Sequence, residues 1–420
     1  MKRTAESHSG YKPEMLTLSN GIPVLVDVVP SVESCAIGVW INAGTRDEGR
    51  GKAGVAHLVE HTSFRRTATR TMSKISKDFE NAGAYANAYT TKEETCYEVR
   101  TLSDAFGRVF DTLADVVTGP VFSEGDIDRE RSIIIEEIKS YEDEAEEFIF
   151  DAGEAQIFGN HPLAVPIVGT VESVRTLTAA DVRAFHQRYY HAQGMVITVS
   201  GNVEPSAVLQ RAERHFGSLP KGKQPVRRKP MILEPTSLVL PRQLQQAHVL
   251  WQVPTPGQSW EDRYALLLLS TVLGDGMTSR LNVRIRERRG LAYTVYSSVQ
   301  LFTDCGTMAI YAGVEDSNVA TVHALIRREL SELALHGVTA AELARARRQV
   351  HASKVMALES LTARMSMLGK GWLEERRPED PRDVFQRLEA VSRQDVQRIA
   401  TELCNPEAWS TCTIVPSTNE

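Results

Sequence analysis

Short apolar runs alternate with longer stretches of helical periodicity along this chain. The first two strand-like runs cover residues 22–29 and 35–43, and a Pro-Ser turn separates them. Stretches with apolar residues at helical spacing follow. This mixture of elements predicts an α+β fold. The further elements expected in the first half are strands around 85–100 and at 194–200, and helices over 103–117, 123–150 and 177–185.

The second half of the chain resembles the first. Residues 391–399 match the helix at 177–185, for which Thr178 is the expected N-cap, and residues 409–415 match the strand that follows it. Between the halves, residues 217–235 contain four prolines, which is typical of a linker. We therefore predict two similar αβ domains from an internal duplication, each with an antiparallel-type sheet packed against helices. The predicted boundaries are 1–218 for the first domain, 219–235 for the linker and 236–420 for the second domain.

Length and composition fit an ordinary globular protein of two domains. The chain has 420 residues, of which 42% are hydrophobic and 24% charged, and its net charge is −6 at pH 7. This charge argues against nucleic acid as the main partner, and the basic cluster at 227–229 is expected to be solvated. The five cysteines are scattered, which favours a reducing compartment. Residues 1–15 lack the apolar core of a secretory signal, and no apolar run reaches the roughly 18 residues of a membrane span, so we expect a bacterial-type cytoplasmic protein.

Residues 57–61, His-Leu-Val-Glu-His, carry the strongest chemical signal in the chain. No proline leads into them, and apolar positions form a stripe beside the polar ones, so the segment is expected to be helical. His57 and His61 then lie on one face, where two neutral imidazoles can take adjacent corners of a zinc tetrahedron. Glu60 is close enough to take a proton from a water that the metal activates. The segment therefore predicts a zinc-dependent hydrolase site.

Zinc in a hydrolase needs a third protein ligand, and the carboxylates at 130–137 are the best candidates. Glu130 and Glu137 are seven residues apart and share a face of the expected helix, whereas Glu136 points about 100° away. Acidic residues on a surface helix are most often only solvated. The apolar run at 133–135 indicates a largely buried helix, in which carboxylates are rarely left unpaired. The residues alone leave the choice between Glu130 and Glu137 open.

The combination of these motifs resembles a known family. The inverted zinc motif, followed 76 residues after His61 by the glutamate that ends a Glu-Arg-x5-Glu pattern, is similar to the pitrilysin/insulinase family of metallopeptidases, the inverzincins. Within that family the chain most resembles the catalytic subunit of the mitochondrial processing peptidase and its bacterial homologues. The resemblance implies one Zn²⁺ per chain, with His57, His61 and Glu137 as ligands, Glu60 as the catalytic base and Glu130 as a supporting carboxylate.

Residues 286–293 are the informative stretch of the second half. From the residues alone they form a basic helix end closed by Gly290, with Arg286 and Tyr293 as ordinary surface residues. The resemblance implies instead that Arg286 grips a substrate carbonyl and that Tyr293 donates to the oxyanion of the reaction. The long glycine-rich loop of the processing peptidase's silent subunit has no counterpart here. The resemblance therefore implies a clam-shell homodimer, in which each site takes zinc from one chain and Arg286 with Tyr293 from the other.

Two further segments bear on substrate binding. On their residues alone, Asn87 and Ala88 belong to a plain hairpin, and residues 141–147 are a solvated acidic run. The resemblance implies that a peptide adds as an extra strand beside Asn87 and Ala88, through main-chain hydrogen bonds. It also implies that Glu147 and Asp151 receive an arginine on the amino side of the cleaved bond.

The motifs and the resemblance together predict a zinc metalloendopeptidase. Its expected substrates are unfolded peptides or presequence-like leader segments, with a preference for a basic residue before the cut. A broad oligopeptide-degrading peptidase is the alternative among enzymes, and the sequence does not separate the two. A non-catalytic core or partner subunit of a larger complex is the alternative outside them. Such relatives usually lack one or more motif residues, whereas the assigned positions are intact here.

Overall fold

The computed structural model describes residues 11–417, which form two compact units. Neither unit is a continuous stretch of chain. The predicted boundaries at 218 and 236 lie near the crossing from one unit to the other at residues 227–228, but two shorter segments are exchanged between the halves. The first unit takes residues up to 138, 166–227 and 355–380, and the second takes 139–165, 228–354 and 381 onwards.

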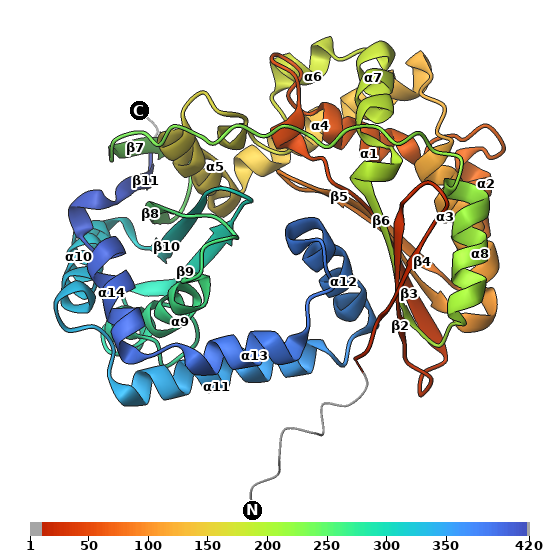
Figure 1. The fold of residues 1–420 in the computed structure, drawn as a ribbon. Coiled ribbons are helices and arrows are strands. Elements are labelled where there is room, and N and C mark those ends of the chain that lie inside the picture. The colour runs from red at the N-terminus through yellow and green to blue at the C-terminus, as the bar shows by residue number, and fades with distance from the viewer. Residues whose placement is uncertain (1–10, 418–420) are drawn as a thin grey trace, which may run out of the picture. The chain divides into compact units, whose positions relative to one another are not determined.

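The first unit is built on a mixed sheet of six strands. These are β1 (Glu14–Thr17), β2 (Pro23–Val28), β3 (Ser34–Ile41), β4 (Tyr85–Thr90), β5 (Thr95–Leu102) and β6 (Met195–Gly201). Their order across the sheet is β1-β2-β6-β3-β5-β4, and β2 to β6 are labelled in Figure 1. Only β2 and β6 run parallel, and the other neighbours are antiparallel. Because β4 lies at the edge, one side of its backbone has no neighbouring strand among residues 11–417.

Helices cover both faces of this sheet. Those that pack into the larger core are α1 (Val55–Ser63), α2 (Met72–Glu80), α3 (Phe106–Thr118), α4 (Glu124–Asp143), α6 (Val171–Thr176), α7 (Ala179–Tyr189) and α8 (Pro205–Phe216). Side chains alternate along the strands, so Val39 faces this core while Trp40 faces α12 (Leu361–Glu375). Met365 of α12 packs beside Trp40, and Arg364 pairs with the buried Asp27 of β2, with Nη2 2.8 Å from Oδ1. These contacts explain why α12 belongs to the first unit.

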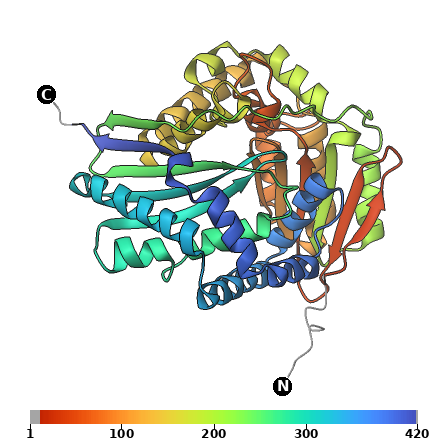
Figure 2. The ribbon, with the colours of Figure 1, turned by 60° about the vertical axis from the view of Figure 1, so that its left-hand side comes forward.

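The second unit repeats the plan on a mixed sheet of five strands. These are β7 (Ser237–Arg242), β8 (Ala247–Thr255), β9 (Ala292–Leu301), β10 (Gly306–Val314) and β11 (Ser410–Pro416), in the order β7-β11-β8-β10-β9. One face is covered by α5 (Ala145–Phe158), which lies along the strands (Figure 2). Its Ile149 packs in a cluster with Leu250 and Ile414. The other helical elements are α9 (Arg263–Leu273), a π-helix (Asn282–Glu287), α10 (Val319–His336), α11 (Ala340–Ala357), α13 (Pro381–Ala390) and α14 (Arg393–Leu403).

The internal duplication is visible in matching elements of the two units. Thr178 caps α7 by accepting a hydrogen bond from the backbone N–H of Asp181, and Ser392 caps α14 from Asp395 in the same way. The strands that follow, β6 and β11, each pair in parallel with one neighbour, β2 and β7. The predicted α+β fold with two similar sheet-and-helix domains is confirmed, although both sheets are mixed. The dimer part of the expectation stays a prediction.

The single helix expected over residues 123–150 is wrong, because the chain forms two helices there. Glu144 is extended between α4 and α5, with φ −84° and ψ 97°. Carboxylates four residues apart on either side of this point, such as Glu142 and Glu146, would repel each other in one continuous helix. The expected burial of residues 133–135 is also wrong in part, since Ile133 is 46% exposed while its neighbour Ile134 is buried.

The connection between the halves lacks helix and strand from residue 220 to 236, as predicted for a linker. Its basic cluster is not simply solvated, however, because the Arg227 guanidinium reaches Asp47 at 2.8 Å and also the backbone oxygen of Glu93 at 2.6 Å. All five cysteines are buried. None of the helices within residues 11–417 combines the length and the apolar character needed to cross a membrane.

Candidate metal centre

Helices α1 and α4 bring three ligand-type side chains together in the first unit. His57 and His61 lie one turn apart on α1, with ring centroids 4.4 Å apart. Glu137 of α4 faces both rings, with Oε1 3.9 Å from Nε2 of His57 and Oε2 3.7 Å from Nε2 of His61. One ligand atom from each residue lies within 4.8 Å of the other two. The structure thus assembles the trio that the resemblance implies as metal ligands.

Glu130 lies two turns before Glu137 on α4 and contacts the His61 imidazole at the ring nitrogen that faces away from Glu137. Its Oε2 is 2.9 Å from Nδ1 of His61, and its other oxygen accepts from Arg65. With the proton on Nδ1, the lone pair of His61 is on Nε2, which faces Glu137. Burial opposes ionisation of Glu130, but the hydrogen bonds from His61 and Arg65 outweigh it and hold its pKa below the ordinary value. Glu130 therefore contacts the ligand-type imidazole of His61 from outside the cluster, and its supporting role stays a prediction.

The donor set fits zinc. Burial, and then the nearby charge of His61, lowers the pKa of His57 to about 3, so this imidazole is neutral at physiological pH. Its Nδ1 is buried and has no hydrogen-bond partner among the described residues. The pKa of His61 is raised, because the bond to Glu130 and nearby carboxylates overcome the effect of burial. Two imidazole nitrogens and one carboxylate oxygen are the protein ligands of many catalytic zinc ions, which keep a further position open. The Glu137 side chain is 29% exposed, so the cluster is open to solvent.

Glu60 sits beside the cluster without belonging to it. Its side chain is buried on the neighbouring face of α1, and Oε2 accepts a hydrogen bond of 2.7 Å from the hydroxyl of Thr90 at the end of β4. Burial raises the pKa of Glu60, although the Thr90 bond opposes the rise. A carboxylate whose pKa is shifted toward neutrality can accept and release a proton during a reaction. This geometry suits the role of general base.

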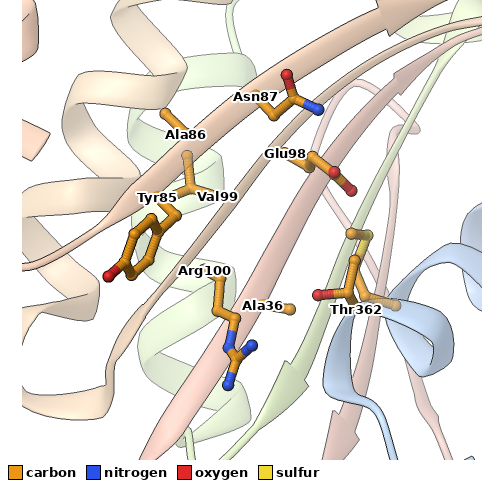
Figure 3. A pocket seen from close by; sticks show the side chains of 9 residues that line it. Ala36, Tyr85, Ala86, Asn87, Glu98, Val99, Arg100 and Thr362 are labelled. Carbon is orange, nitrogen blue, oxygen red and sulfur yellow. The ribbon is translucent and has the colours of Figure 1, made fainter.

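The edge strand β4 leads up to this centre and has a cavity beside it. Asn87 is exposed and Ala88 is half-buried. Asn87, Glu98 and Arg100 line a cavity of about 340 Å³ together with Thr362 of α12 (Figure 3). A second cavity, of about 470 Å³, is lined by residues of α1, α2, α4 and the start of β4, including His61, Glu130 and Ala86. The free edge beside Asn87 and Ala88 is thus flanked by space for side chains of an added strand.

The other predicted site residues belong to the second unit. Glu147 is exposed and lies one turn from Asp151 on α5. Arg286 is exposed in the π-helix, and its carbonyl accepts from the N–H of Gly290 at 2.8 Å, which closes the turn as expected. Tyr293 on the edge strand β9 is 79% exposed. The metal cluster is formed without these four residues, and their roles stay predictions.

Two contacts of the site were missed by sequence reasoning. Arg65 lies four residues after His61, so helical spacing alone could have placed it on the same side as Glu130. Thr90 is 30 residues from Glu60 and carries no spacing signal. The contact between Thr90 and Glu60 becomes evident only from the packing of β4 against α1.

Comparisons with known proteins identify relatives of this chain. Residues 24–171 match the description "Insulinase (Peptidase family M16)", and residues 176–350 match "Peptidase M16 inactive domain". An uncharacterized zinc protease of Mycobacterium tuberculosis is 35% identical over 404 residues, covering 95% of this chain and 92% of that protein. One from Bacillus subtilis is 33% identical over 404 residues, covering 96% and 98%. A crystal structure of a peptidase M16 inactive domain from Pseudomonas fluorescens shares the fold, with a TM-score of 0.90, 21% identity and coverage of 97% and 99%.

Proposed function

Because the chain belongs to the insulinase family of peptidases (family M16), we propose that it is an active zinc-dependent endopeptidase. The observation that carries the proposal is the convergence of His57, His61 and Glu137, with Glu60 beside them. Relatives that share about a third of its residues are named zinc proteases. The second unit, matched in part by the description of an inactive domain, supplies none of these three ligands.

Different residues of the first unit would bind the metal and transfer the proton during peptide hydrolysis. When bound, zinc supplies positive charge that polarises a peptide carbonyl and makes a water more acidic. His57, His61 and Glu137 would hold the ion. Oε2 of Glu60 is already engaged by Thr90, so Oε1 is the atom that takes the proton from the attacking water. The same carboxyl then returns this proton to the leaving amine, a role that typically contributes about 10²–10⁴-fold.

The proposed substrates are unfolded peptides or presequence-like segments. The free edge of β4 supports this, because an extended chain can add there through main-chain hydrogen bonds that read little sequence. Glu147 and Asp151, one turn apart on α5, are proposed to receive a basic side chain before the cut. Arg286 and Tyr293 are proposed to act on the substrate from the partner chain of a homodimer. The five buried thiols support a reducing, cytoplasmic compartment.

The test is cleavage of an unstructured peptide by metal-free and zinc-loaded protein. We expect activity only with zinc, and a loss of at least about 100-fold in the Glu60→Gln variant with the metal retained. Glu136→Gln is the matched control, because this exposed glutamate lies next to Glu137 and outside the cluster. Near-normal turnover by Glu60→Gln would remove the assignment of the base. A wild-type protein that binds zinc but cleaves nothing would support the alternative of a non-catalytic subunit.

The substrate preference needs a separate comparison. Two peptides that differ only by arginine or alanine before the cut should be cleaved at different rates, because a desolvated arginine–carboxylate contact contributes about 1.5–3 kcal/mol. The difference should shrink in a Glu147→Gln variant. Equal rates in the wild-type protein would contradict the proposed preference and would favour a broad peptidase.

A further inference from the structure

A carboxylate behind the metal-binding helix has no part in the chemistry described above. Glu48 follows a 3₁₀ turn (Thr45–Asp47) and reaches the start of α1. Its Oε2 accepts from the backbone N–H of Gly54 at 3.0 Å, and its Oε1 accepts from that of Ala56 at 2.8 Å. The first amides of a helix have no partner within the helix, and the N-cap Gly54 has no side chain to offer. Glu48 therefore caps α1 from outside it.

The start of α1 is also confined by its neighbours. Gly54 has φ +86°, and a Cβ atom at this position would lie 2.8 Å from the carbonyl oxygen of Val168. The hydroxyl of Ser173 donates to the carbonyl of Ala53 at 2.9 Å. The backbone at residues 53–54 is thus packed closely against a second segment of the same unit. Within this confined setting, Glu48 accepts hydrogen bonds from the amides of Gly54 and Ala56 at the start of the helix.

Burial raises the pKa of Glu48 to about 8, and the two backbone N–H groups together with Lys92 limit the rise because they stabilise the charged form. A negative charge at a helix N-terminus is also favoured by the helix dipole. The two hydrogen bonds, rather than a permanent charge, are therefore what Glu48 contributes to the start of α1.

We propose that Glu48 is a positioning residue for the metal centre, which it serves by fixing the first turn of α1. His57 follows Ala56 directly, and His61 lies one turn further along the same helix. A shift of the first turn would move both Nε2 atoms relative to Glu137 on α4. Contacts that orient metal ligands typically change metal affinity by about 10–100-fold when they are removed. The zinc-binding part of this inference rests on the proposed function.

Glu48→Gln removes one acceptor oxygen and nearly keeps the size of the side chain. A glutamine has one acceptor oxygen, so its NH₂ group would face one of the two N–H donors. Glu48→Asp keeps the carboxyl group but is one methylene shorter, so it can satisfy one donor more readily than both. Asp27→Asn is the matched control for the loss of a buried carboxylate in the same unit, because Asp27 pairs with Ser200 and Arg364.

The experiment measures zinc affinity by competition with a chromogenic chelator, using the full-length chain. We expect Glu48→Gln to bind zinc about 10–100-fold more weakly than wild type, Glu48→Asp to lie between them, and Asp27→Asn to stay within about twofold even if its melting temperature falls. Zinc affinity of Glu48→Gln within twofold of wild type would overturn the proposal, and so would an equal loss in Asp27→Asn. If Glu48→Gln does not fold, Glu48→Asp against the same control decides the question.

Hydrogen exchange of the metal-free proteins gives a readout that does not depend on zinc. The amides of the first turn of α1 should exchange faster in Glu48→Gln than in wild type and Asp27→Asn, because one of the two amides that bond to Glu48, those of Gly54 and Ala56, loses its acceptor. Unchanged exchange in this segment would contradict the role of Glu48. A wild-type protein that binds no zinc would instead refute the proposed function, and the exchange comparison would still decide whether Glu48 holds α1.

Discussion

Replacement of Glu130 by glutamine should weaken zinc binding without changing the packing around this side chain, because the two residues have nearly the same size. Glu130 is 3% exposed and contacts the Nδ1 of His61 at 2.9 Å as well as Arg65. Glutamine keeps the size and one acceptor oxygen but loses the charge. A hydrogen bond to a charged group contributes about 1.5–3 kcal/mol, and part of this energy fixes the tautomer that presents Nε2 to the metal. We expect zinc to bind roughly 10–100-fold more weakly, which corresponds to about 1.4–2.7 kcal/mol.

The assay is the same chelator competition, combined with urea unfolding of the metal-free protein. Arg65 would keep its charge beside a neutral partner, so a loss of stability of about 1–3 kcal/mol is expected as well. Glu136→Gln, an exposed change on the same helix and outside the metal cluster, should leave the zinc affinity near that of wild type. The reasoning would be refuted if Glu130→Gln lost stability but bound zinc as tightly as wild type, because Glu130 would then be structural only.

Three other outcomes follow from the structure. Thr90→Val should retain zinc but lower kcat about tenfold, since Oε2 of Glu60 loses its 2.7 Å hydrogen bond; an unchanged kcat would show that this bond does not orient the base. Glu60→Gln and Tyr293→Phe subunits should each be nearly inactive alone, and co-refolded mixtures should regain activity if the site is completed by a partner chain; a mixture without rescue would place the whole site within one chain. Burial lowers the pKa of His186 to about 4 from an unfolded value of about 6.5, so the unfolded state binds a proton more readily and stability should fall as pH drops through that interval, by about 3 kcal/mol. His186→Phe should reduce this pH dependence of the free energy of unfolding, measured by urea titration at several pH values. The same pH dependence in both proteins would contradict the assignment of the effect to His186.

The chemistry of the metal centre could be predicted because its candidate ligands occur as pairs separated by short distances in the sequence. Two histidines one helical turn apart and two glutamates two turns apart are patterns that a single helix converts directly into a shared face. The spacing did not decide whether Glu130 or Glu137 is the third metal ligand, and only the family resemblance indicated Glu137. In the structure Glu137 faces the two Nε2 atoms, whereas Glu130 reaches Nδ1 of His61 from the other side.

The parts that sequence reasoning missed depend on packing between distant segments. The apolar pattern of a helix predicts a buried face but not the sheet against which that face packs. For this reason neither α5 nor α12 could be assigned to its unit from the sequence. The same holds for Arg227, whose partner Asp47 lies 180 residues earlier. Sequence spacing also gave no sign that Glu48 would return to the start of α1, because its bonds depend on the conformation of residues 49–53. The break at Glu144, by contrast, had a local cause in the repelling carboxylates around it.

The most direct test of the account is anomalous diffraction at the zinc absorption edge from crystals of the zinc-loaded protein. We predict one peak per chain, in contact with His57, His61 and Glu137, and its disappearance in the His57→Ala variant. A peak at another place in the chain, or a peak that persists without the His57 imidazole, would contradict the assignment of the metal centre.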